Sequence, residues 1–354
     1  MHISKHIAYL VSAFALFAAG AAEHPSFTSK PMLAGRASLT EDGFRVSRNL
    51  GTANATPELA YPIELTYESF SEKTGIFGFA WRSPQLESSA VWDKDGVLWT
   101  TPWGERVKFR SKKEKPPKDA VKIALHEEAK KGRGWFAPYS DWEADTAAQR
   151  PEVAGDWTFA GKRGMKGWTF TYRGGRLARI SAPSGRTLEF AYDKAGRPVS
   201  ISQDGTAFVV LSYGSDGLAA SVTVNGVETR LAYQNGNLSI LPKTLDGKAV
   251  SATRPRLVSM KTADLHPETY GYDGNYLSEI RRGGYVEKLT VQTETLMERR
   301  RNLRAADLKS KVDHTGKVAG RLLSDGDFTY SYGKATGSVT LTDRADRTAR
   351  YAFN

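Results

Sequence analysis

The chain has no cysteine among its 354 residues. Disulfide bonds, thiolate nucleophiles and cysteine-ligated metal sites are therefore excluded, and so is a lipid anchor on an N-terminal cysteine. Catalytic motifs are missing as well. His126 begins a His-Glu-Glu triplet without the second histidine of a zinc-protease helix, and neither a Gly-x-Ser-x-Gly turn nor a complete phosphate loop occurs. We therefore expect no enzyme activity, no metal and no cofactor.

One enzymatic alternative stays open. Asp141, Glu143 and Asp145 lie beside Trp142 and form an acidic and aromatic patch. Glycoside hydrolysis uses two carboxylates that meet only in space. A polysaccharide-active enzyme is therefore an alternative that this sequence leaves open.

Long apolar runs are also missing, apart from one at the N-terminus. Lys5 and His6 precede an apolar run over residues 7–17, and small residues follow over 18–22. This order is typical of a cleaved bacterial export signal over residues 1–22. The run is shorter than the roughly 20 residues of a membrane span, although an uncleaved anchor is an alternative. We expect a secreted, periplasmic or cell-surface protein with no transmembrane span in the mature chain.

What the sequence does contain is a repeat of about twenty residues. Tyrosines at 172, 192, 213 and 233 are 20, 21 and 20 residues apart, and a second series of glycines at 185, 205, 226 and 247 lies between them. Two turn signals per period indicate two strands and two turns per repeat. In the unit over residues 187–205, alternating apolar residues end at Tyr192, Asp193 and Gly196 form a turn, and Arg197 begins the return strand.

This pattern closely resembles the YD repeat of the bacterial RHS and animal teneurin families. The best match is Tyr-Asp-Lys-Ala-Gly-Arg at residues 192–197. Segments 61–67 and 75–81 resemble the opening of RHS shells, with a Gly-x-Phe-Gly-x-x-Trp turn. The third and fourth copies lack the aspartate after tyrosine. The repeat positions are Tyr172, Gly175, Arg176, Tyr192, Asp193, Gly196, Arg197, Tyr213, Gly217, Tyr233, Gly236, Tyr272 and Asp273.

The resemblance implies an all-β fold, an array of antiparallel β-hairpins that forms a curved or spiralling sheet. It also implies a loose association with surface adhesion and carbohydrate binding. The toxin release of long RHS proteins is not implied, because the sequence has no Asp-Pro-x-Gly motif. We expect a signal peptide over 1–22, a linker or irregular segment over 23–57, an RHS-like β region over 58–169 with a charged loop at 111–131, hairpin repeats over 170–285, and a C-terminal β region with a basic interruption over 286–354.

Two side-chain groups are candidates for binding. Trp135, Tyr139 and Trp142 lie beside the charged loop, in a segment whose apolar and polar residues do not alternate as they do in a strand. This favours a glycan-stacking surface over hairpin packing for these rings. The alternative is that these rings are core residues. The net charge of +11 includes two clusters that are candidates for binding polyanions. These are Lys112, Lys113, Lys115, Arg299, Arg300 and Arg301.

The alternative for both basic clusters is a solvated surface that protects sheet edges. We expect no nucleic-acid partner, because the chain carries an export signal and has no nucleic-acid recognition motif. Three hypotheses follow: an exported, non-enzymatic structural or glycan-binding module at the cell envelope, a fragment or partner of an RHS-type shell, and the polysaccharide-active enzyme. The sequence does not decide the oligomeric state.

Overall fold

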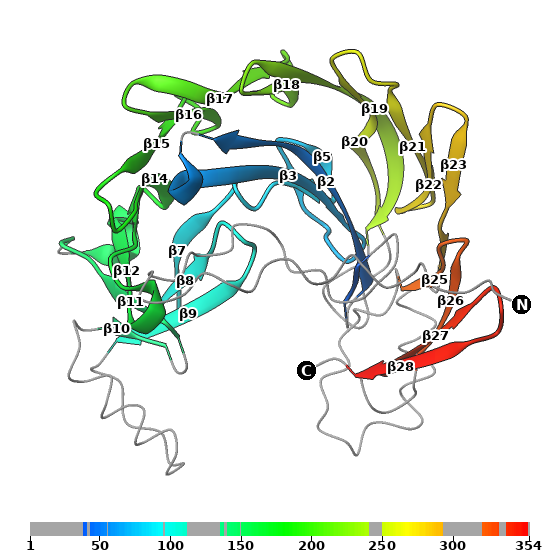
Figure 1. Cartoon of the computed structure of the whole chain (residues 1–354), viewed down its shortest axis with the longest axis horizontal. Coiled ribbons are helices and arrows are strands. Elements are labelled where there is room, and N and C mark those ends of the chain that lie inside the picture. Colours follow the sequence, from blue (N-terminus) through cyan, green and yellow to red (C-terminus); the bar gives the residue numbers. More distant parts are fainter. Residues whose placement is uncertain are drawn as a thin grey trace, which may run out of the picture.

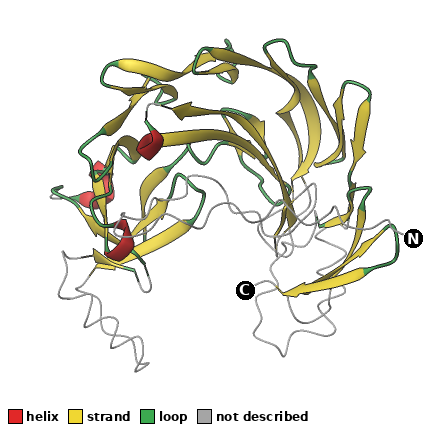
Figure 2. Cartoon of the chain, in the orientation of Figure 1, coloured by secondary structure: helices red, strands yellow, loops and turns green. Residues whose placement is uncertain are grey.

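The computed structural model describes residues 38–40, 43–54, 56–94, 96–111, 135–137, 140–148, 150–240, 250–292, 321–332 and 338–352. Nearly all regular structure in them is β-strand (Figure 2). Successive strands follow one another around an open arc (Figure 1). The prediction of an all-β array of antiparallel hairpins in a curved sheet is therefore confirmed. No helix in these ranges is long and apolar enough to cross a membrane.

The arc consists of one long antiparallel sheet whose strands pair mostly in chain order. A single residue pair, Arg176 with Ser89, also joins β14 to β7. The strands are β7 (Ser89–Asp93), β8 (Gly96–Thr100), β9 (Arg106–Ser111), β10 (Trp135–Phe136), β11 (Trp142–Asp145), β12 (Trp157–Gly161), β13 (Thr169–Arg173), β14 (Arg176–Ser181), β15 (Thr187–Tyr192), β16 (Pro198–Gln203), β17 (Thr206–Tyr213), β18 (Ala219–Val224), β19 (Val227–Ile240), β20 (Val250–Thr262), β21 (Glu268–Asp273), β22 (Tyr276–Arg282) and β23 (Tyr285–Lys288).

An N-terminal sheet lies inside this arc (Figure 1). Its inner position follows from contacts with the repeats: Gly78 lies against the Pro255 carbonyl, and the Asn225 amide donates to the Thr52 carbonyl at 2.6 Å. The elements of this region are β1 (Ser38–Thr40), β2 (Gly43–Asn54), η1 (Pro57–Leu59), β3 (Ala60–Glu68) and β6 (Trp81–Arg82), with the small hairpin β4 (Thr74–Gly75) and β5 (Gly78–Phe79).

A third sheet forms the C-terminal end of the arc. It contains β24 (Thr290–Val291), β25 (Leu322–Ser324), β26 (Phe328–Tyr332), β27 (Ser338–Asp343) and β28 (Thr348–Ala352). Two short helical turns, α2 (Pro151–Ala154) and η2 (Arg163–Met165), connect strands of the long sheet.

Residues 43–54 differ from the predicted linker. They form β2, in which Phe44, Val46, Leu50 and Ala53 are buried. A bulge between Asn49 and Gly51 shifts the register against β3. A bulge moves the following side chains to the other phase of the strand, so strict alternation is lost and the sequence pattern alone does not show the strand.

The fourth repeat also differs from the prediction. Gly236, predicted as a turn glycine, lies inside β19 opposite Arg254. The ladder continues through it because β20 supplies partners along its whole length. A Cβ at this position would lie 2.7 Å from Nε of Arg256, so the close approach of that side chain explains the glycine. Gly247 and residues 112–131 of the predicted charged loop lie outside the described residues.

The core of the first half is aromatic. Trp99 is fully buried and stacks on Phe159 with a centroid distance of 4.3 Å. Trp142 and Phe170 meet Trp99 at 5.5 and 5.7 Å. Such pairs add to the free energy gained by burial. The concentration of tryptophan in the first half therefore reflects core packing.

Candidate functional site

The repeat tyrosines connect each hairpin to the preceding one. The Tyr192 hydroxyl donates to the Leu177 carbonyl at 2.8 Å, and the Tyr213 hydroxyl donates to the Pro198 carbonyl at 2.5 Å. Tyr233 and Tyr272 repeat this contact with the carbonyls of residues 219 and 257 at 2.9 and 2.6 Å. A bulge precedes each of these tyrosines and Tyr172 in the ladder. The twenty-residue period is thus a period of tyrosine contacts.

The repeat arginines lie over the same rings. Arg176 lies over Tyr192 at 6.0 Å and Arg197 over Tyr213 at 4.3 Å, measured from the guanidinium carbon to the ring centroid. Each arginine immediately precedes the residue whose carbonyl accepts the tyrosine bond. A cation over a ring contributes about 0.5–1 kcal/mol at exposed sites. We call this series of contacts the tyrosine–arginine ladder.

Asp193 closes the turn that leads into Arg197. Its carboxylate accepts hydrogen bonds from the Arg197 backbone N–H at 2.8 Å and from Arg197 Nε at 2.7 Å. These two bonds lower the pKa of Asp193. Gly196 has φ +78°, which suits glycine. The Tyr-Asp-x-x-Gly-Arg motif is therefore used by the fold itself.

The ladder also contains members that the sequence prediction missed. Arg256 lies over Tyr272 at 5.0 Å, although its segment has no turn signal. In the C-terminal sheet, Arg321 lies over Tyr332 at 4.7 Å, and the Tyr332 hydroxyl donates to the Leu322 carbonyl at 3.0 Å.

The C-terminal sheet repeats the aspartate turn too. Asp343 accepts from the Arg347 backbone N–H at 2.9 Å and from its Nε at 2.6 Å. Asp346, with φ +59°, stands at the position of the turn glycine. The spacing Asp-x-x-x-Arg was the signal that could have identified this copy.

Two tryptophans of the N-terminal half bond to the ends of the repeat series. Trp99 Nε1 donates to the Tyr172 hydroxyl at 2.7 Å, and Trp81 Nε1 donates to the Tyr272 hydroxyl at 2.8 Å. Ser88 Oγ also lies 2.6 Å from the Tyr172 hydroxyl. The N-terminal half and the repeats are therefore joined by hydrogen bonds between buried groups.

A cavity of about 220 Å³ lies between the segment that precedes β7 and the Asp193 turn. Burial raises the pKa of Glu87, one of its lining residues, to about 7, although the Ser83 backbone N–H, which donates to its Oε2 at 2.8 Å, opposes the shift. A carboxyl group with a raised pKa in a cavity is a candidate for function. The lining residues are Ile76, Leu86, Glu87, Ser88, Ser89, Arg176, Tyr192, Gly196, Arg197 and Pro198.

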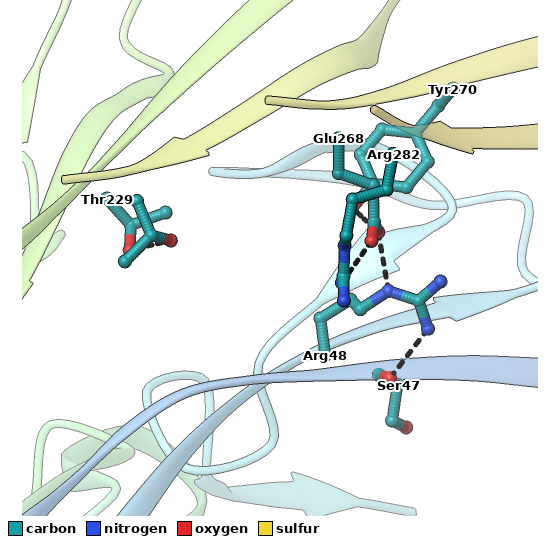
Figure 3. Close-up of polar contacts among 7 residues, drawn as sticks. Ser47, Arg48, Thr229, Glu268, Tyr270 and Arg282 are labelled. Atoms are coloured by element: carbon teal, nitrogen blue, oxygen red, sulfur yellow. Dashed lines mark hydrogen bonds and ion pairs between the residues drawn. The ribbon is translucent and has the colours of Figure 1, made fainter. Parts of the chain in front are cut away.

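A second polar cluster lies where β2 meets β21 and β22. Glu268 is 3% exposed and lies 2.5 Å from Arg48 Nε, and it also pairs with Arg282. The Tyr270 hydroxyl donates to the same carboxylate at 2.6 Å. Figure 3 shows both guanidinium groups directed at it. Burial raises the pKa of Glu268, but Arg48, the bond from Tyr270 and Arg282 outweigh it, so the pKa is lowered.

Of the three predicted glycan-stacking side chains, the structure describes that of Trp142. Trp142 is 6% exposed and packs against Trp99, Trp103 and Phe170. This buried position does not fit a stacking role and matches the core alternative. Trp135 lies in β10, and Tyr139 lies outside the described residues. The predicted polyanion-binding residues also lie outside them: Lys112, Lys113, Lys115, Arg299, Arg300 and Arg301.

The predicted acidic patch lies in β11 and at the residue directly before it. Asp141 forms an ion pair with Arg163 at 3.6 Å. Glu143 and Asp145 are two residues apart in β11, so they share one face of that strand. Glu143 and Asp145 are therefore neighbours on one strand and do not come from two facing elements. In the described part of the chain, no group of three or more histidine and carboxylate side chains could hold a metal ion.

Comparison with known proteins gives one family match and several distant structural ones. The chain of TcdB2-TccC3 is 13% identical over 89% of this chain and 16% of its own length, with a TM-score of 0.32. The structure of TcdB2-TccC3 without its hypervariable C-terminal region is 13% identical over 89% of this chain and 16% of its own length, with a TM-score of 0.33. The TcdB2-TccC3-Cdc42 structure is 11% identical over 87% of this chain and 19% of its own length, with a TM-score of 0.28. The chain therefore spans less than a fifth of these proteins.

No curated protein matches the sequence. The family model described as RHS Repeat matches residues 173–207. This match covers β14 to β16, with the Arg176–Tyr192 contact and the Asp193 turn. The Tyr-Asp pattern predicted this match, and the chain carries an RHS repeat in these residues.

Proposed function

We propose that this chain is an exported, non-enzymatic structural and binding module at the cell envelope, with glycans as its ligand class. The observation that supports this proposal is the use of the motif residues. Tyr192, Asp193 and Arg197 bond within the repeat array itself, as scaffold residues do. Export rests on the apolar run at residues 7–17 and its small-residue flank.

Two properties favour glycans among possible ligands. The net charge is +11, which attracts acidic polymers through long-range fields. The cavity beside the Asp193 turn combines apolar walls with polar groups, as sites for small molecules do.

A glycan array tests this proposal. The chain without residues 1–22 is applied to neutral and acidic glycans at low and moderate salt. We expect signal on acidic glycans that survives moderate salt, because a specific site is less screened than a diffuse surface charge. A folded protein without signal on any glycan would contradict the proposal. Circular dichroism of the same sample verifies the fold.

Association with another RHS-type chain is a second candidate. In the described part of the chain, β23 pairs with β22 on one side alone. Its Val286 side chain is 40% exposed. An apolar edge strand can add a strand from another chain. Mixing with a separate RHS-repeat chain should give a larger species in size-exclusion chromatography, and Val286→Lys should abolish it. An unchanged elution volume in the mixture would count against this candidate.

A further inference from the structure

The cavity beside the Asp193 turn brings unlike groups to one place. Glu87 and Ser89 come from the segment that precedes and begins β7, and Arg176 and Arg197 come from two successive repeats. Ile76, Leu86, Pro198 and the ring of Tyr192 supply apolar wall. The volume of about 220 Å³ is suited to one sugar ring rather than to a chain of them.

The two arginines differ in their partners. Arg197 is bound to Asp193 at 2.7 Å and lies over Tyr213. Arg176 has no carboxylate partner among the described residues, and its guanidinium lies over Gly196, where a Cβ would be 2.1 Å from Nη2. The glycine thus leaves room for Arg176 at the cavity. A guanidinium can bind a carboxylate through two parallel hydrogen bonds.

Glu87 is held by contacts within the N-terminal region. Its Oε2 accepts a hydrogen bond from the Ser83 backbone N–H. Its Oε1 lies 2.6 Å from the point that a Cβ on Gly75 would occupy. The charged groups that act on it are Arg82, Glu68 and Lys73 from the N-terminal region. Arg176 and Arg197 line the same cavity. Tyr192 lines the cavity, and Tyr213 and Tyr233 lie within electrostatic range. A protonated Glu87 can donate a hydrogen bond to a sugar hydroxyl, and an ionised one would repel an anion.

We propose that this cavity binds a single carboxylated sugar unit of the hexuronic acid class, with its carboxylate on Arg176 and its ring against Tyr192 and Pro198. This inference rests on the proposed glycan binding and gives it a site. Because Glu87 has a pKa of about 7, the sugar binds more tightly below pH 7 than above it.

Titration calorimetry with glucuronate tests the site, with glucose and inorganic sulfate as matched probes. We expect wild-type protein to bind glucuronate more tightly than either probe, and about tenfold more tightly at pH 6 than at pH 8. Arg176→Gln should weaken binding about tenfold or more. Arg179→Gln is the control, because Arg179 lies on the same strand and pairs with exposed Glu189 instead. Glu87→Gln should remove the pH dependence.

The outcomes separate this site from the proposed function. Equal binding of glucose or of sulfate would overturn the recognition of an acidic sugar. Glycan-array signal that Arg176→Gln leaves unchanged would overturn the site and leave glycan binding standing. A wild-type protein that binds neither glucuronate nor any glycan on the array would overturn both.

Discussion

Glu268 carries its charge in the interior, between two arginines from distant parts of the chain. Arg48 belongs to β2 and Arg282 to β22, so one carboxylate joins the inner sheet to the repeat arc. Charges in such places are stable only when they are paired and hydrogen-bonded. The Tyr270 hydroxyl completes this arrangement.

Glu268→Gln should lower the free energy of unfolding by about 3–5 kcal/mol, because it leaves Arg48 without its counter-charge in a partly buried place. Urea denaturation measures this change. Glu279→Gln is the matched control, since Glu279 pairs with the exposed Arg281 on the face of β22 opposite to Arg282, and surface pairs contribute little. Equal losses in both variants would contradict the role of burial.

The same variant has a characteristic pH dependence. The folded-state pKa of Glu268 is lowered, so its contribution to stability is present above the unfolded value of about 4.3 and is lost as the pH falls below it. Wild-type protein and Glu268→Gln should therefore differ at neutral pH and converge in acid.

Among the elements, the hairpins differ in what their turns contact. Gly205 turns into open space, with φ +78° and no atom within 4 Å of the point that a Cβ would occupy. Gly78, with φ +85°, is the first residue of β5 and lies against Tyr233 of β19 and Pro255 of β20. A Cβ on Gly78 would lie 2.9 Å from the Pro255 carbonyl oxygen.

This difference predicts unequal effects of alanine. Gly205→Ala should cost about 1–2 kcal/mol, the penalty of a positive φ for a residue with a Cβ. Gly78→Ala should lower the free energy of unfolding by more than Gly205→Ala does, because the backbone at Pro255 must also move away from the new methyl group. Urea denaturation of both variants measures the difference. A loss in Gly78→Ala that is no larger than in Gly205→Ala would show that this hairpin does not pack closely in solution.

Across the molecule as a whole, the inner sheet and the arc share one core. Trp81 of β6 donates to the repeat tyrosine Tyr272, and Tyr61 of β3 meets Phe190 of β15 edge to face at 5.7 Å. Neither layer buries its apolar face without the other. We infer that they unfold together.

Tryptophan fluorescence and far-ultraviolet circular dichroism test this inference. All eight tryptophans lie between residues 81 and 168, so fluorescence reports the first half and dichroism reports all strands. We expect the same urea midpoint from both signals, as in a two-state transition. Trp81→Phe should lower both midpoints together. Separate midpoints in wild-type protein would contradict a shared core.

Much of the arc follows from local sequence. The spacing of Tyr192, Asp193, Gly196 and Arg197 is enough to predict the turn, the strand ends and the RHS repeat, because each residue acts on its own hairpin. The Arg321–Tyr332 contact was not predicted, because no Tyr-Asp pair precedes Gly320 and Arg321, although the Gly-Arg-Leu sequence at 320–322 matches that at 175–177. The sequence predicts a turn at Gly236, because the sequence alone does not distinguish a glycine required for close packing from a glycine required for a positive φ.

The all-β class, the repeat period and the absence of thiol chemistry follow from the amino-acid sequence alone. All three depend on composition or on neighbours within a few residues. The folded chain was needed to show that Trp142 is a core ring, that β2 lies inside the arc, and that Glu87 and Arg176 line one cavity. These outcomes depend on contacts between residues far apart in the chain, and no local pattern encodes which distant partner a buried ring or carboxylate will meet.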